Sequence, residues 1–91
     1  MKSKYILEDD DYLFVLELES NGKYIDVDTS LFGLPVLNIN EKGIAWGIYM
    51  SYTEPVELYI LRVECKNDEI VNAEVKVMRD IEVCKILWKQ K

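Results

Sequence analysis

Apolar and polar residues alternate along most of the chain, with the period of two that is typical of β-strands with one buried face. The alternation is clearest in residues 12–20 and 23–29, which the Asn-Gly pair at 21–22 separates. Asn-Gly between two alternating runs is a strong hairpin signal, because both central residues of a type I′ turn need a positive φ. A two-residue loop there places Leu18 opposite Ile25, and the hairpin then has one apolar face.

A second hairpin is predicted over residues 35–52, with its turn at 40–43. Its register places Leu37 opposite Trp46. The second strand has one face of large apolar residues and one face of mostly small residues. We assign the large face, with Trp46, to the core, and we expect Tyr49 on the small face to reach the surface.

A meander is predicted in the last third of the chain. A three-residue loop at 67–69 joins two alternating runs, and the resulting register pairs Arg62 with Glu74 on one face and Cys65 with Val71 on the other. Opposite charges directly across a sheet attract, and the apolar residues then share the second face.

The end of the chain has two interpretations. A tight turn at Arg79-Asp80 would lead into a further strand at 81–88, which continues the alternation. Arg-Asp is not a preferred hairpin pair, and Asp80 is a good N-cap, so a helix at 80–90 is the alternative.

These patterns predict an all-β fold, a small antiparallel sandwich or barrel of about six or seven strands built from hairpins and a meander. The alternative is an α+β fold with the C-terminal helix at 80–90. The chain has 91 residues, of which 49% are hydrophobic and 31% charged. That is enough for one core, so we expect a single domain over residues 1–91.

The predicted register of the first hairpin gathers carboxylates on its outward face. Glu17 lies opposite Asp26, and Glu19 and Asp28 flank this pair, with Tyr24 on the same face. Such a face can recognise a basic partner surface. It can equally be a solvated face whose repulsion is tolerated for solubility.

The meander has an apolar end on its second face, close to the turn at 79–80. Either another segment covers this end within the fold, or the end is a surface for self-association. The residues concerned are Leu58, Ile60, Met78, Ile81 and Val83.

Composition removes most catalytic and metal chemistry. The chain has no histidine and only two cysteines, Cys65 and Cys84, which are not in a metal-binding spacing. No glycine-rich phosphate-binding motif occurs. We therefore expect no enzymatic activity, no metal site and no cofactor.

Charge and hydropathy bear on partners and location. The formal net charge is −6, so direct binding to nucleic acid is not expected. No apolar run approaches the ~18 residues of a membrane span, and the N-terminal apolar stretch is too short for a signal peptide. We expect a cytoplasmic protein without a membrane partner.

Small size, acidity, the lack of histidine and the lack of a catalytic motif together resemble the general class of protein inhibitors and immunity proteins, including phage antagonists of bacterial defence nucleases. The resemblance is one of composition and assigns no residue a role. It implies a non-enzymatic, acidic protein-binding module that blocks a basic partner surface, such as a nucleic-acid-binding groove. The alternatives are a small self-associating structural or assembly protein, a homo-oligomer, and a small-ligand carrier that uses the face with Ala45, Gly47 and Ser51.

Overall fold

The computed structural model describes residues 2–9, 12–50 and 57–78, and the described residues form eight strands and no helix. The strands are β1 (Ser3–Asp9), β2 (Tyr12–Ser20), β3 (Tyr24–Asp28), β4 (Phe32–Gly33), β5 (Val36–Asn38), β6 (Ile44–Met50), β7 (Leu58–Lys66) and β8 (Glu69–Met78).

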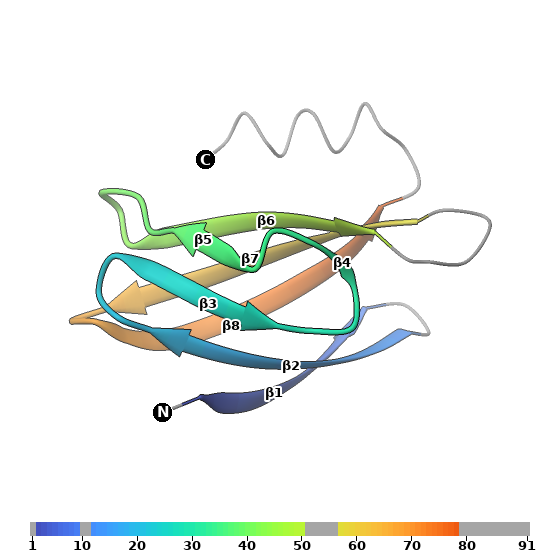
Figure 1. Cartoon of the computed structure of the whole chain (residues 1–91), viewed down its shortest axis with the longest axis horizontal. Helices are drawn as coiled ribbons and strands as arrows, with labels where there is room; N and C mark the ends of the chain where they lie inside the picture. The colour runs from blue at the N-terminus through green and yellow to red at the C-terminus, as the bar shows by residue number, and fades with distance from the viewer. Residues whose placement is uncertain (1, 10–11, 51–56, 79–91) are drawn as a thin grey trace.

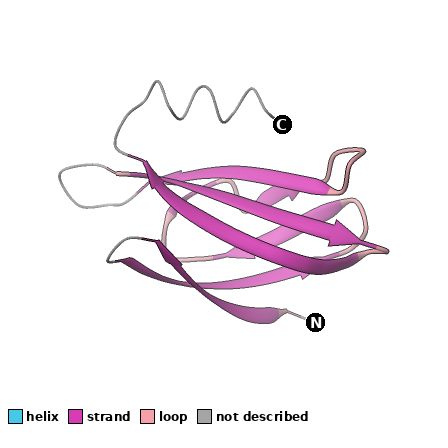
Figure 2. Cartoon of the chain, turned by 180° about the vertical axis from the view of Figure 1, so that it is seen from behind, coloured by secondary structure: helices cyan, strands magenta, loops and turns pink. Residues whose placement is uncertain are grey.

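The strands form two antiparallel sheets of four strands each, which lie as two layers (Figure 1, Figure 2). The strand order is β1-β2-β3-β5 in the first sheet and β4-β6-β7-β8 in the second sheet. The predicted all-β sandwich is therefore confirmed. The predicted strand at 81–88 and the alternative helix at 80–90 both lie outside the described residues.

The core lies between the two layers, and alternate residues of both sheets fill it. Phe14 on β2 and Tyr59 on β7 meet across the layers in an edge-to-face contact, with ring centroids 4.9 Å apart. This geometry is one of the favoured arrangements of aromatic pairs. The other buried hydrophobic residues of the core cluster are Leu16, Leu18, Ile25, Val27, Leu37, Ala45, Tyr49, Leu61, Val63, Val75 and Val77.

The first hairpin has the predicted faces but not the predicted pairs. Leu18 lies opposite Val27 rather than Ile25. The side-chain oxygen of Asn21 accepts hydrogen bonds from the backbone N–H of Lys23 and of Tyr24, at 3.0 and 2.8 Å. Asn21 therefore precedes the turn and stabilises it with its side chain, and the two-residue loop is 22–23 instead of the predicted 21–22. A shift of two residues leaves each side chain on its face, so the apolar face survives.

The second hairpin is wrong as a pair of strands, although its turn is present. The backbone N–H of Gly43 donates to the carbonyl of Asn40 at 3.0 Å, as a turn at 40–43 requires. However, β5 pairs with β3 in the first sheet, where Leu37 lies opposite Ile25, while β6 pairs with β4 and β7. The turn therefore connects the two layers.

The faces of β6 are also the reverse of the expected ones. Ala45, Gly47 and Tyr49 face the core, and Trp46 is only half-buried on the outer face of the second sheet. The ring of Tyr49 explains the small residues. A Cβ added at Gly47 would lie 2.8 Å from Tyr49 Cε2, and one added at Gly33 would lie 2.2 Å from Tyr49 Cδ1. Two glycines thus leave the space that one large buried ring fills.

The register between β7 and β8 is confirmed over most of its length, including the pair Arg62 and Glu74. The pair next to the turn is wrong, because Cys65 lies opposite Ile70 and the register shifts between Glu64 and Cys65. Asn67 and Asp68 have φ of 54° and 65°. Two central residues with positive φ make a two-residue turn of type I′, so Glu69 belongs to the strand and not to the loop. Val71 is then left without an opposite residue on β7 and forms a bulge.

Candidate functional site

Four predicted acidic residues lie together on the outer face of the first sheet. In the observed register Glu17 lies opposite Asp28, and Glu19 lies opposite Asp26. The expected pair of Glu17 with Asp26 is wrong, since the turn moves the register by two residues, yet the same four residues still share one face. Tyr24 is exposed on this face, opposite Asn38 of β5. We call these five residues the acidic face: Glu17, Glu19, Tyr24, Asp26 and Asp28.

The N-terminal strand brings two cations to the rim of the acidic face. Lys4 lies opposite Glu17 in the register of β1 and β2. Lys2 Nζ lies 3.8 Å from Asp28 Oδ2, and both side chains are largely exposed. The acidic face is therefore flanked by cations on the β1 side.

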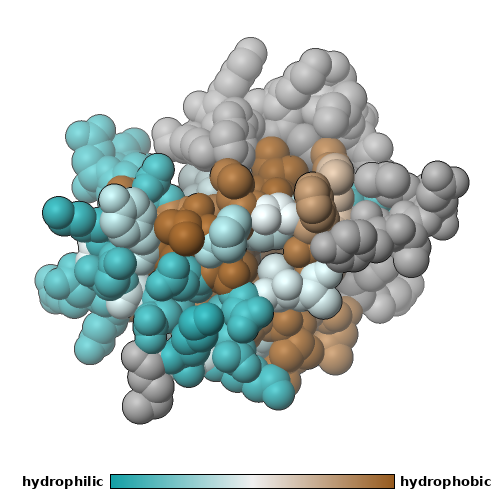
Figure 3. Space-filling model, in the orientation of Figure 1, coloured by the Kyte–Doolittle hydropathy of each residue, from teal (hydrophilic) through white to brown (hydrophobic). Residues whose placement is uncertain are grey.

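Next to the acidic face lies a set of apolar side chains that sequence reasoning missed. Ile6 lies opposite Val15, and Leu13 lies opposite Glu8. Ile6 is 61% exposed, Leu13 61% and Val15 49%. We call Ile6, Leu13 and Val15 the apolar strip. In the lower part of Figure 3, where Figure 1 places β1 and β2, hydrophilic residues gather toward the left and hydrophobic residues toward the right.

The signal for this strip was present only in part. The alternation of residues 12–20 places Leu13 and Val15 on the same side as Glu17. The partner Ile6 could not be placed, because the pattern of residues 3–9 does not show which strand they pair with.

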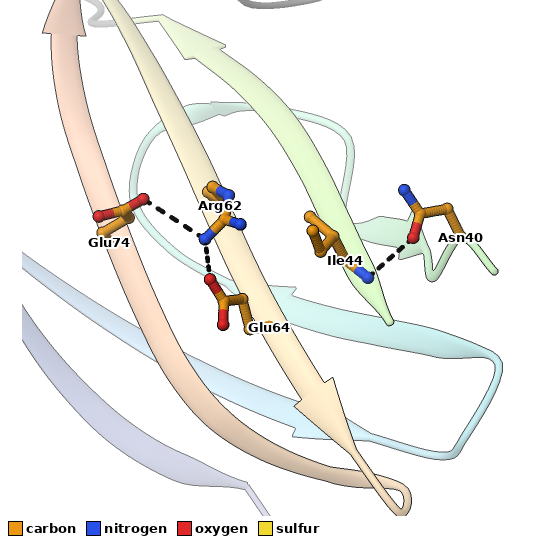
Figure 4. A network of polar contacts seen from close by, with 5 residues as sticks. All are labelled: Asn40, Ile44, Arg62, Glu64 and Glu74. Carbon is orange, nitrogen blue, oxygen red and sulfur yellow. Dashed lines mark hydrogen bonds and ion pairs between the residues drawn. The ribbon is translucent and has the colours of Figure 1, made fainter. Parts of the chain in front are cut away.

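The outer face of the second sheet carries a different polar cluster, shown in Figure 4. The guanidinium of Arg62 pairs with Glu64 on its own strand and lies 3.6 Å from Glu74 Oε1 on β8. Its Cζ atom lies 5.6 Å from the ring centroid of Trp46. The nearby turn is held by Asn40, whose side-chain oxygen accepts from the backbone N–H of Ile44 at 2.9 Å. This cluster joins three strands, and two carboxylates share the single positive charge of Arg62.

The residues predicted for self-association are only partly within the described chain. Leu58 is half-buried, and Ile60 beside it exposes only 4% of its surface, although it lies outside the core cluster. Ile60 is therefore a buried residue and not part of an exposed patch. The side chain of Met78, and Ile81 and Val83, lie outside the described residues.

The described part of the face predicted for a ligand carrier leaves no room for a ligand, and Ser51 of that face lies outside the described residues. Ala45 is fully buried, and the space above Gly47 is filled by Leu37 and Tyr49. An open groove of about 290 Å³ lies instead between β5 and β6, lined by Leu34, Val36, Leu37, Asn38, Trp46, Gly47 and Ile48. Its volume is at the lower limit of small-molecule sites.

Little catalytic chemistry is assembled in the described part of the chain. Cys65 is a free, half-buried thiol, and burial raises its pKa, which keeps it protonated at neutral pH and weakens it as a nucleophile. Among the described residues, no group of three or more His, Cys, Asp or Glu side chains is placed to hold a metal ion. Nor do these residues include a helix that is long and apolar enough to cross a membrane.

Comparison with known proteins finds no matching family model, no matching curated protein and no matching solved structure.

Proposed function

We propose that the chain is a non-enzymatic, cytoplasmic protein-binding module that blocks a basic surface of a partner protein with its acidic face. The partner surface would be of the kind that binds nucleic acid. Carboxylates spaced along adjacent strands present the same sign of charge as phosphates, so they can occupy a groove that is built for phosphates. In its mode of action the protein would be an inhibitor or an immunity-type protein.

The observation that carries this proposal is the direct opposition of like charges on β2 and β3. Glu17 lies opposite Asp28, and Glu19 opposite Asp26. Each such pair destabilises a sheet by a few tenths of a kcal/mol to ~1 kcal/mol relative to neutral neighbours. A cationic partner surface would relieve this repulsion on binding and would be attracted over a distance of ~10 Å at 0.1 M salt.

The proposal is tested with two baits that differ in the position of their charges and not in their number. In the first bait, Glu17→Lys and Asp26→Lys change the acidic face. In the second, Glu41→Lys and Glu69→Lys change exposed residues elsewhere, at the turn before β6 and at the start of β8. Both baits carry the same formal net charge.

Each bait and the wild-type protein are used to capture proteins from host lysate at low salt, with identification by mass spectrometry. We expect at least one protein that the wild type and the second bait retain and the first bait loses. If the two altered baits retain the same proteins in the same amounts, the acidic face does not select a partner and the proposal is wrong.

A further inference from the structure

The apolar strip is an unusual feature for the open face of an antiparallel sheet. The outward positions of such a face are ordinarily polar, since they meet water. Here Ile6 and Val15 are directly opposed on neighbouring strands, and Leu13 extends the strip along β2. All three side chains are about half-exposed or more.

Carboxylates lie at both ends of the strip. Glu8 lies opposite Leu13 at one end. At the other end Glu17 follows Val15 on the same face of β2, beside Lys4 of β1, and the remaining carboxylates of the acidic face lie beyond this pair. At the rise of a β-strand, Leu13 and Glu17 are roughly 13 Å apart along β2. The strip therefore suits an occupant that is apolar in its centre, with one cation near Glu8 and another toward the carboxylates of β2 and β3.

We propose that the apolar strip binds an amphipathic basic helix of the partner protein, with the apolar stripe of the helix on Ile6, Leu13 and Val15. This inference rests on the proposed function and specifies what the partner presents. Two turns of helix span about 11 Å, so cations two turns apart match the two acidic ends of the strip. The strip crosses two strands, and a helix lying on the sheet contacts both, whereas a segment paired to a sheet edge would add to one strand only.

A second copy of the chain fits this surface poorly. Face-to-face packing of two copies would bring the acidic face of each against, or close to, the same carboxylates of the other. The chain already carries a net charge of −6, so its copies repel one another at low salt. The carboxylates that repel a second copy of the chain attract a cationic segment.

The test uses two synthetic peptides of 15 residues. Both consist of leucine and lysine only, and both contain the same number of each. In the ordered peptide the leucines form one helical face with lysines on both sides, and in the scrambled peptide they are spread around the helix. Binding of fluorescently labelled peptide is followed by anisotropy at low salt. We expect the wild-type protein to bind the ordered peptide at least about tenfold more tightly than the scrambled one, because only the ordered peptide buries the strip.

Protein variants assign this difference to the strip. The triple change Ile6→Thr, Leu13→Thr and Val15→Thr keeps residues suited to strands and should abolish the preference for the ordered peptide. Val15→Thr alone should reduce it, which keeps the test valid if the triple variant melts early. Val71→Thr is the matched control, since Val71 is exposed on the second sheet, and it should retain the full preference.

The outcomes separate this inference from the proposed function. One outcome is that both peptides bind equally, the threonine variants behave as wild type, and Glu17→Lys/Asp26→Lys weakens the binding of both peptides. This outcome overturns the inference of a helix on the apolar strip and leaves the acidic face as a binding surface. No weakening by Glu17→Lys/Asp26→Lys overturns the proposed function itself. A wild-type dimer in light scattering that the triple variant dissociates would show that the strip is a self-interface and would also overturn the inference.

Discussion

The hydroxyl of Tyr49 donates a hydrogen bond to the backbone carbonyl of Leu34, with an O···O distance of 2.6 Å. Tyr49 belongs to β6 and exposes only 2% of its surface, and Leu34 lies between β4 and β5. The bond therefore ties the second sheet to the segment by which the chain returns to the first sheet. It also gives the buried hydroxyl the partner that burial requires.

Tyr49→Phe should lower the free energy of unfolding by about 1–2 kcal/mol, because the carbonyl of Leu34 loses its donor while the ring still fills its site. Urea denaturation at neutral pH measures the change. Tyr24→Phe is the control, since its ring is exposed on the acidic face, and it should remain within ~0.5 kcal/mol of wild type. Equal effects of the two variants would contradict the role of the Tyr49 hydrogen bond.

Alkaline pH should weaken the fold through the same residue. Burial raises the pKa of Tyr49 to about 12. Because the folded state favours the neutral phenol, this contribution to stability is complete below pH ~10, the value of an unfolded tyrosine, and is lost as pH rises from there toward about 12. The full loss should be roughly 2–3 kcal/mol, about half of it by pH ~11.

Urea denaturation at pH 9, 10 and 11 compares wild type with Tyr49→Phe. The stability difference between the two proteins should shrink as the pH rises, since the variant has no phenol to ionise. A difference that stays constant over this range would show that Tyr49 ionises as readily in the folded chain as in the unfolded one.

Gly33→Ala should destabilise the fold by about 1–3 kcal/mol, because the added methyl group would lie 2.2 Å from a ring carbon of Tyr49. The ring must then move, and its hydrogen bond to Leu34 with it. Gly47→Ala should cost less, since part of its contact is with the flexible end of Leu37. Thermal melting of the two variants decides the order, and the reverse order would contradict the placement of the ring.

Arg62→Ala should lower the free energy of unfolding by ~1 kcal/mol, because it removes the ion pairs with Glu64 and Glu74 and the contact with Trp46. Arg62→Lys should recover only part of this, since a lysine lacks the planar group that lies over the indole. Urea denaturation measures both, with Lys66→Ala as an exposed control on the same strand. Full recovery by lysine would show that charge alone matters at this position.

The sequence was a good guide wherever the period of two decided the structure. The inward and outward faces of β2, β3 and β7 follow directly from alternation, and the opposed pair of Arg62 and Glu74 follows from the register. The faces of β8 follow as well except next to the turn, where the bulge exposes Val71 and packs Ile70 against the core. Register itself was less secure. The side chain of Asn21 closes a different turn from the one that Asn-Gly predicts, and a shift of two residues leaves no trace in the hydrophobic pattern.

Two errors have a common cause in contacts between distant segments. The burial of Tyr49 depends on space left by Gly33 and Gly47, which belong to different strands. The larger residues on the face of Trp46 therefore indicated the wrong face of β6 for the core. The pairing of β5 with β3 rather than β6 depends on the same long-range packing. For the acidic face, alternation sufficed to gather its members, whereas the apolar strip needed the partner strand β1.

The central claim is that Glu17, Glu19, Asp26 and Asp28 form a recognition surface for a basic partner. Its most direct test is the association rate of a captured partner with the wild type, with Glu17→Lys/Asp26→Lys, and with the charge-matched control Glu41→Lys/Glu69→Lys, over a range of salt concentrations. In the observed register each reversal on the acidic face opposes one carboxylate, while Glu17→Lys also places a second cation opposite Lys4, so stability should stay within roughly 0.5 kcal/mol of wild type. We expect Glu17→Lys/Asp26→Lys to associate at least about tenfold more slowly at low salt and to lose most of its salt dependence, while the control stays close to wild type. Equal association rates for the two altered proteins at low salt would contradict the claim, because the position of the charges would then not matter.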